Sequence, residues 1–208
     1  MPTVVLATRN RGKARELQAL LAGVPVLIRT LDDFPEVPSI PESGHTYEAN
    51  AVAKASTVAR LTGNIALADD SGIEIDALDG APGVNSATFL GPDATDVDRN
   101  TWVLGRLEGM ASPRRTARYR AIVAIATPDG AIRAFEGMCE GRIAEAPRGS
   151  EGFGYDPIFV VADLEQTMAE LSPATKNRIS HRARALAAAR GYLESLVRNS
   201  AVESPPRP

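Results

Sequence analysis

The sequence predicts an α/β protein with a mixed sheet, and two observations lead to this class. Early in the chain, short apolar runs typical of buried strands alternate with longer segments of helical periodicity. Later, two apolar-rich segments flank the turn sequence PDG, which indicates a long antiparallel hairpin. Alternating strands and helices favour parallel pairing, and the hairpin adds antiparallel pairing, so the sheet should be mixed.

The early elements follow from the spacing of their apolar residues. TVVLAT predicts a buried strand over residues 3–8, and the next leucines recur at helical spacing before Gly23. VPVLIRTL predicts a second strand, and the proline- and acid-rich DDFPEVPSIPESGH predicts a loop. The alanine-rich TYEANAVAKASTVARLTG predicts a helix ending at Gly63, and IALADD predicts a third strand.

The later elements are less regular. GAPGVNSATFLGPDATD predicts an irregular loop, DVDRNTWVLGRLEGM a helix, and TARYRAIVAIATPDGAIRAFEGMCEGRIAE the hairpin. PRGSEGFGYDPIFV predicts a glycine-rich loop running into a strand, and SHRARALAAARGYLESLVRN a final helix in which Ser180 could be the N-cap. We expect a single domain over residues 1–198 and a disordered tail over residues 199–208.

Composition excludes several classes of protein. The 208 residues are 44% hydrophobic and 24% charged, and a net charge of −3 gives no reason to expect a nucleic-acid partner. The single cysteine, Cys139, cannot form a disulfide within the chain, which favours a reducing compartment. The N-terminal MPTVVLATRN does not resemble a signal peptide, and no apolar run approaches the roughly 18 residues of a membrane span. We therefore expect a cytoplasmic protein with no membrane partner.

The first candidate site is LATRNRGKARE, where a predicted strand passes into a predicted helix. The orphan N–H groups and the positive dipole end of that helix could hold a phosphate. Thr8 and Asn10 offer hydrogen bonds, and Lys13 adds a charge. An asparagine N-cap followed by a solvated basic face explains the segment equally well.

The second candidate is ADDSG, where Asp69 and Asp70 end the third predicted strand and Ser71 follows. Adjacent carboxylates repel each other, so the pair lies in solvent or is held by a cation. Oxygen ligands at a strand end suit Mg²⁺, which favours one or two carboxylates with substrate phosphates. Glu42 could complete such a site and Lys54 could reach a phosphate, although a loop acid and a solvated helix lysine are the ordinary alternatives.

Two further segments combine aromatic and basic side chains. In GSEGFGYDPIF, glycines flank Phe153 and Tyr155, so the backbone could approach a ligand and a ring could stack on a flat base. Aromatic rings folded into the core are the alternative. SPATKNRISHRARA holds a local basic cluster made of Lys176, Arg178, His181 and Arg182. Cations in the first turn of a helix oppose its dipole, which suggests another partner, although a solvated surface histidine remains an alternative.

In order along the chain, the motifs are T-x-N-x-x-K, E-x-G-x-T, N-A-x-x-K-A, A-D-D-S-G-I followed by D-A-L-x-G-x-P-G-V, then G-F-G-Y-D-P-I-F and S-H-R. This series, from about Thr3 to Leu196, resembles the inosine/xanthosine triphosphate pyrophosphatases of the Ham1 type. The resemblance implies an elongated α/β fold with two lobes and a central cleft, Mg²⁺ as cofactor, and a homodimer. It also implies hydrolysis of dITP, ITP and XTP to the monophosphate and pyrophosphate, which cleanses the nucleotide pool.

The resemblance also implies roles for individual residues. Asp70, Lys13 and Lys54 would be catalytic, and Asp70 and Glu42 would hold Mg²⁺. Adjacent side chains of a strand point to opposite faces, and the family match selects Asp70 over Asp69. The residues implied in substrate binding are Thr8, Arg9, Asn10, Arg11, Gly12, Lys13, Ser71, Phe153, Gly154, Tyr155, Asp156, Lys176, His181 and Arg182.

Three positions depart from the family pattern. Arg9 stands where a small residue is common, TYEANA displaces a glutamate that often precedes the asparagine, and Thr88 stands where arginine is common. Three alternative functions remain open at this stage. They are a phosphatase with an aspartyl nucleophile, a pyrophosphatase of modified pyrimidine nucleotides, and a nucleotide-binding regulator without turnover.

Overall fold

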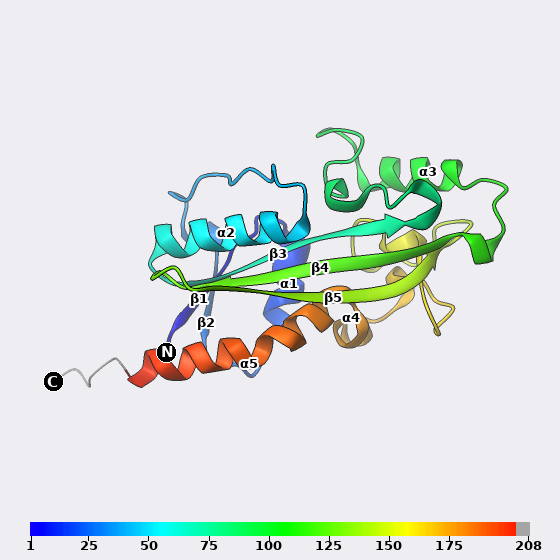
Figure 1. Cartoon of the computed structure of the whole chain (residues 1–208). Coiled ribbons are helices and arrows are strands. Elements are labelled where there is room, and N and C mark those ends of the chain that lie inside the picture. Colours follow the sequence, from blue (N-terminus) through cyan, green and yellow to red (C-terminus); the bar gives the residue numbers. More distant parts are fainter. Residues whose placement is uncertain (203–208) are drawn as a thin grey trace. The chain divides into compact units, whose positions relative to one another are not determined.

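The computed structural model describes residues 1–202 of the chain (Figure 1). Six strands in this part of the chain form one sheet in the order β2-β1-β3-β4-β5-β6, with β1 parallel to β2 and β3, and β5 antiparallel to β6. The α/β class and the mixed sheet are therefore confirmed. The strands are β1 (Thr3–Leu6), β2 (Leu27–Thr30), β3 (Ile65–Ile75), β4 (Thr116–Ala126), β5 (Ile132–Ile143) and β6 (Phe159–Val161).

Within residues 1–202, five α-helices accompany the sheet, and polar side chains begin most of them. The side chains of Asn10, Thr46 and Thr95 accept hydrogen bonds from the first turns of α1, α2 and α3. Ser180 Oγ accepts from the Ala183 N–H in the first turn of α5, as its expected N-cap role requires. The helices are α1 (Arg11–Leu20), α2 (Tyr47–Thr62), α3 (Asp96–Arg106), α4 (Pro173–Ile179) and α5 (His181–Val202).

The structure differs from the expected elements at the end of the chain. The sequence did not predict α4, which has only 7 residues. Helix α5 continues to Val202, so the first residues of the expected tail (199–208) are helical. Residues 203–208 of that tail lie outside the described residues.

The chain forms two compact units, each made of discontinuous segments. Unit 1 contains residues 1–70, 122–136 and the chain from 185, and unit 2 contains residues 71–121 and 137–184. In unit 1, α2 and α5 lie on opposite faces of the strands (Figure 1). Both faces of β1 are thus covered, which explains its continuous apolar sequence, and Val4, Val5 and Leu6 are fully buried.

Strand β3 is longer than the sequence predicts. The expected end lies at Asp70, whereas the strand continues to Ile75. Its parallel neighbour β1 ends at Leu6, opposite Leu67. Asp69 and Asp70 therefore lie in the middle of β3, just past the carboxyl end of β1, and not at the start of a turn. Burial of both faces and pairing with β4 keep the chain extended beyond the acids.

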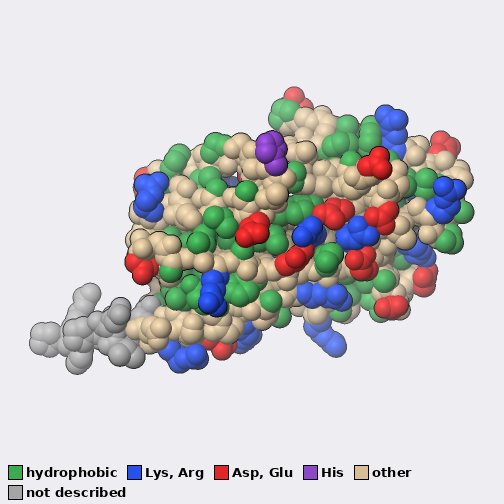
Figure 2. Space-filling view, viewed as in Figure 1, with side chains coloured by type: hydrophobic (Ala, Val, Ile, Leu, Met, Phe, Trp, Pro, Cys, Tyr) green, Lys and Arg blue, Asp and Glu red, His purple; other side chains and the backbone are tan. Residues whose placement is uncertain are grey.

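The surface shows no large area of one charge on the face drawn in Figure 2, where acidic and basic side chains are interspersed. In unit 2, the basic Arg118 pairs with two acids, with Asp76 at 2.9 Å and with Glu140 at 3.3 Å. Within residues 1–202, no helix has the length and apolar character needed to cross a membrane.

Candidate active site

Two carboxylates converge on one lysine in unit 1. Lys54, on α2, is 7% exposed and Asp70, on β3, is 3% exposed. Lys54 Nζ donates to Asp70 Oδ1 at 3.1 Å and to Glu42 Oε1 at 2.8 Å. It also donates to the Asp69 carbonyl oxygen at 2.9 Å. The ammonium is therefore not solvated, contrary to the ordinary alternative for a helix lysine.

Asn50 holds the second oxygen of the same carboxylate. It lies one turn before Lys54 on α2, and its Nδ2 donates to Asp70 Oδ2 at 3.1 Å. Its Oδ1 accepts from the Gly44 N–H at 2.8 Å, which ties the loop that carries Glu42 to the same helix. Our sequence analysis gave Asn50 no role, although its i, i+4 spacing from Lys54 places both residues on one helix face.

Burial and neighbouring charges shift the pKa values of both Asp70 and Lys54 in this cluster. Burial raises the pKa of Asp70, and the nearby charges of Lys54 and Lys13 only partly offset this effect, so the pKa stays above its usual value. Burial alone would lower the pKa of Lys54, but the charges of Asp70 and Glu42 outweigh burial and raise it. Lys54 thus remains charged beside a carboxylate more basic than an ordinary aspartate.

Asp69 is bound by a different lysine. Its side chain is completely buried, and its Oδ2 lies 2.8 Å from Lys13 Nζ, in the first turn of α1. Asn10 Oδ1 accepts from the Lys13 N–H at 3.0 Å, and Thr8 Oγ1 accepts from the Asn10 N–H at 3.2 Å. The asparagine N-cap is therefore present, but Lys13 is paired with a buried acid and is not part of a solvated basic face.

The other members of the expected phosphate segment have separate environments. Arg9 Nη2 donates to the Val37 carbonyl oxygen at 2.7 Å, so this departure from the family pattern anchors the loop after β2. Arg11, which is exposed, and Gly12, which is buried, begin α1. The N–H groups of a helix's first turn have no acceptor within the helix, so this end of α1 can accept an anion.

Unit 2 brings the aromatic loop and the basic cluster together around a buried acid. Asp156 is 3% exposed. Its Oδ2 accepts from the Phe153 N–H at 2.9 Å and from Lys176 Nζ at 2.5 Å. Tyr119 donates its hydroxyl to Asp156 Oδ1 at 3.2 Å. Lys176 Nζ also lies 5.0 Å from the centroid of the Phe153 ring, a cation–π contact.

His181 and Arg182 start α5 in the same unit. The His181 ring stacks on Tyr119, with centroids 4.5 Å apart and planes 10° apart. Arg182 is 1% exposed, donates from Nη2 to Ser71 Oγ at 3.0 Å, and lies 5.7 Å from the Phe153 ring centroid. His181 is 4% exposed, so the solvated-histidine alternative is wrong. Our sequence analysis missed Tyr119, and its position within an apolar strand gave no signal.

The two aromatic residues of the loop differ. Tyr155 is 4% exposed, belongs to the hydrophobic core of unit 2, and donates its hydroxyl to the Ser86 carbonyl oxygen at 3.0 Å. The core alternative therefore holds for Tyr155. Phe153 is only partly buried and carries two cations near its ring. Thr88, a departure from the family pattern, is exposed and makes a local turn bond to the Asn85 carbonyl oxygen.

Residues 4–192 match the model of the Ham1 family. The chain belongs to the Ham1 family.

Individual relatives support the same assignment. The dITP/XTP pyrophosphatase of Geobacter sulfurreducens is 48% identical over 193 residues, which cover 93% of this chain and 97% of that protein. The dITP/XTP pyrophosphatase of Symbiobacterium thermophilum is 52% identical over 184 residues, which cover 88% of this chain and 91% of that protein. The solved structure of a HAM1 protein from Coxiella burnetii aligns with a TM-score of 0.82 at 41% identity, covering 96% of this chain and 100% of that chain.

In this member of the Ham1 family, Glu42 and Asp70 are the residues that fit a magnesium ion. Within residues 1–202, no three His, Cys, Asp or Glu side chains gather into a metal site of protein ligands alone. The Glu42 and Asp70 oxygens do converge on one positive charge, the Lys54 ammonium. Two hard oxygen ligands with substrate phosphates are the donor set that Mg²⁺ favours, so the residues present fit the ion.

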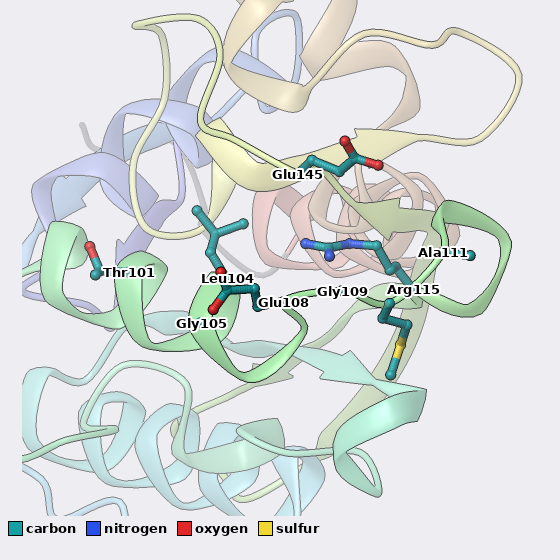
Figure 3. Close-up of a pocket in the computed structure, with 9 residues that line it drawn as sticks. Thr101, Leu104, Gly105, Glu108, Gly109, Ala111, Arg115 and Glu145 are labelled. Carbon is teal, nitrogen blue, oxygen red and sulfur yellow. The ribbon is translucent and has the colours of Figure 1, made fainter.

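A cavity of about 690 Å³ also lies in unit 2, at the end of α3 (Figure 3). Thr101 and Leu104 line it from α3, and Glu108 lines it from the turn after that helix. Arg115 and Glu145 line it from the chain before β4 and after β5. The residues that line this cavity include none of those that the Ham1 resemblance implies in substrate binding.

Proposed function

We propose that this chain hydrolyses the non-canonical purine nucleoside triphosphates dITP, ITP and XTP to the monophosphate and pyrophosphate. The observation that carries the proposal is the 48% identity to a dITP/XTP pyrophosphatase across nearly the whole of both chains. The ion pairs of the buried Lys54 with the buried Asp70 and with the exposed Glu42 support it, because hydrolysis of an acid anhydride needs a base and fixed positive charge. Such an activity would keep these nucleotides out of DNA and RNA.

Asp70 is the catalytic carboxylate in this proposal. Water attacks the α-phosphorus, and Asp70 orients the water and accepts its proton. Asn50 supports this role, because its Nδ2 holds Asp70 Oδ2 while Lys54 holds Oδ1. Lys54 and Lys13 stabilise negative charge on the phosphate oxygens. The first turn of α1 and the side chains of residues 8–13 bind the phosphates.

Glu42 and Asp70 would hold the magnesium ion. When bound, Mg²⁺ supplies Lewis acidity that neutralises phosphate oxygens and favours departure of pyrophosphate. Lys54 contacts both carboxylates, so this chain already holds the two ligands close to one point. That preorganisation supports a sparse site completed by the substrate.

The cluster in unit 2 binds the base in this proposal. Phe153 stacks on the purine, and Lys176, His181 and Arg182 offer hydrogen-bond donors to its 6-keto oxygen. Adenine carries an amino group at that position and would leave those donors unpaired. Mismatches of this kind lower kcat/KM by roughly 10⁴-fold. Ser71, held by Arg182, contributes a further polar contact to the substrate.

The proposal also covers the oligomeric state of the protein and its location in the cell. We propose a homodimer that works in the cytoplasm on small nucleotides, without a nucleic-acid or membrane partner. The net charge of −3 and the mixed charges on the face in Figure 2 support the absence of a polyanion partner.

Product analysis tests the function. Purified protein is incubated with ITP, dITP, XTP, dGTP and ATP in Mg²⁺, and monophosphate, diphosphate, pyrophosphate and orthophosphate are separated. We expect monophosphate and pyrophosphate from the non-canonical purines, with a loss of roughly 10³-fold in Asp70→Asn. Asp93→Asn, an exposed loop substitution, is the matched control.

Three other results would each favour a competing function. Orthophosphate with a diphosphate product favours the aspartyl phosphatase. Preference for modified pyrimidine triphosphates favours the pyrimidine pyrophosphatase. Tight binding of ITP without turnover favours the nucleotide-binding regulator.

A further inference from the structure

Helix α3 contains none of the residues implied in substrate binding, yet two of its side chains hold the aromatic loop. Asp96 Oδ2 accepts from the Gly154 N–H at 2.8 Å. Asn100 Nδ2 donates to the Gly154 carbonyl oxygen at 3.1 Å. Asp96 and Asn100 are four residues apart, so both lie on one face of α3 and bind the same residue of the loop.

The two hydrogen bonds fix both peptide groups that flank the Gly154 Cα. Gly154 has a φ of +64°, in the left-handed region that a glycine enters and leaves without steric cost. A bond to its N–H and a bond to its carbonyl oxygen therefore restrict a residue that has little conformational preference of its own. The turn at Gly154 separates Phe153 from Tyr155, whose ring lies in the core.

The start of α3 is itself well defined. Thr95 and Asp98 form a capping box, in which Thr95 Oγ1 accepts from the Asp98 N–H and Asp98 Oδ2 accepts from the Thr95 N–H. This cap fixes Asp96 in the first turn, where a carboxylate also interacts favourably with the helix dipole. Asn100 is 6% exposed, so its amide is confined by packing as well.

We propose that Asp96 and Asn100 are positioning residues for purine binding, which set the orientation of the Phe153 ring by clamping Gly154. This inference rests on the proposed function, in which Phe153 stacks on the base. Restraints on either side of Gly154 include the bond from the Phe153 N–H to Asp156 and the bond from the Tyr155 hydroxyl to Ser86. The α3 clamp supplies the restraint between them, on the residue that joins the two rings.

The clamp should act on nucleotide affinity and not on the chemical step. The predicted catalytic carboxylate, Asp70, is held by Lys54 and Asn50, which belong to other elements. Without the two bonds to Gly154, the loop would also populate conformers in which Phe153 does not contact the base. Excluding these conformers on binding costs free energy, which lowers the affinity for the nucleotide. The expected signature is a raised KM with an unchanged kcat.

Three variants test the clamp in steady-state hydrolysis of dITP by the full chain. Asp96→Ala removes the acceptor, and we expect KM to rise about tenfold with kcat within twofold of wild type. Asp96→Asn keeps an acceptor oxygen of the same shape and should restore a KM within about twofold of wild type. Asn100→Asp replaces the donor with an isosteric acceptor and should raise KM at least as much as Asp96→Ala.

The controls separate the clamp from general damage to the helix. Thr101→Asp adds a charge at an exposed position on the same helix and should leave both constants unchanged. The single tryptophan, Trp102, lies on α3, so its fluorescence reports whether each variant keeps the helix packed. If Asn100→Asp loses the Trp102 signal of the packed helix, the comparison of Asp96→Ala with Asp96→Asn still tests the clamp. The Asp96 side chain is 54% exposed, so its removal disturbs little packing.

The outcomes distinguish this inference from the proposed function. Wild-type turnover of dITP with an unchanged KM in Asp96→Ala and Asn100→Asp overturns the clamp and leaves the function standing. A fall in kcat at constant KM also overturns it, since the residues would then act on the chemical step. Absence of turnover of every 6-keto purine triphosphate by the wild type overturns the function and the clamp with it.

Discussion

Asp69 and Asp70 are consecutive residues of β3, and each carboxylate lies against a different lysine. Lys13 of α1 binds Asp69 at 2.8 Å, and Lys54 of α2 binds Asp70 at 3.1 Å. Because side chains alternate along a strand, one chain segment presents two acids to two helices. Two separate cations therefore offset the repulsion expected between adjacent carboxylates. Asp69 is then a structural acid, and Asp70 is the acid of the proposed reaction.

Replacement of Lys13 should destabilise the protein through Asp69. Lys13→Met leaves the fully buried Asp69 carboxylate without its lysine. We expect the free energy of unfolding at pH 7 to fall by about 3 kcal/mol. Adding Asp69→Asn in the same chain removes the buried charge and should restore most of that loss. Urea denaturation followed by Trp102 fluorescence measures both changes. If the double variant is no more stable than Lys13→Met, the ion pair does not account for the loss.

Replacement of Glu42 should weaken the response to magnesium. Glu42→Gln removes one of two carboxylates that converge near Lys54, and we expect the Mg²⁺ concentration for half-maximal dITP hydrolysis to rise roughly tenfold. Glu48→Gln, an exposed acid in the first turn of α2, is the matched control. Identical magnesium titrations for the two variants would exclude Glu42 as a ligand.

Two glycines of the aromatic loop should differ in their tolerance of alanine. Gly152 and Gly154 both have positive φ, of +80° and +64°. Alanine at either position should therefore lower the free energy of unfolding by about 1–2 kcal/mol. A Cβ at Gly152 would lie 2.0 Å from Asp156 Oδ2, whereas a Cβ at Gly154 meets nothing within 4 Å. Gly152→Ala must therefore displace Asp156 from Lys176, a buried pair worth a further ~3 kcal/mol. Equal unfolding free energies for the two variants would contradict this account.

Cys139 should make the protein less stable at alkaline pH. Burial raises the pKa of its thiol from 9.0 to about 11, an effect that Arg184 only partly offsets. A group whose folded pKa is raised contributes stability below its unfolded pKa and loses that contribution as pH rises through the folded pKa. We therefore expect the free energy of unfolding to fall between pH 9 and 11, and to fall less steeply in Cys139→Ala. Parallel slopes in urea titrations of the two proteins would rule out this contribution.

Much of the fold could be predicted because its elements carry local signals. The apolar run of β1, the alanine-rich face of α2 and the PDG turn each reflect burial or backbone geometry within a few neighbouring residues. Helix α4 has only 7 residues, too few to repeat a helical pattern. The extension of β3 was missed because Ser71 and the next glycine are typical turn residues, and only pairing within the sheet keeps them extended.

The candidate site was predictable in its parts but not in its contacts. The motifs that resemble the Ham1 family predicted roles for Asp70 and Lys54. Asn50 contacts Asp70 only because α2 packs its polar face against β3. Likewise, the sequence around Phe153 and Tyr155 cannot tell which ring enters the core. That choice is made by the left-handed turn at Gly154 and by bonds from α3, which lies more than fifty residues away in the chain.

The discontinuity of the two compact units limits how such a protein can be altered. The chain passes between the units at residues 70/71, 121/122, 136/137 and 184/185, so neither unit corresponds to one stretch of gene. A recombination event that exchanges a continuous segment would therefore replace part of both units at once. Single substitutions within loops and helix faces can change one unit of this chain at a time, but neither unit can be replaced as one continuous module.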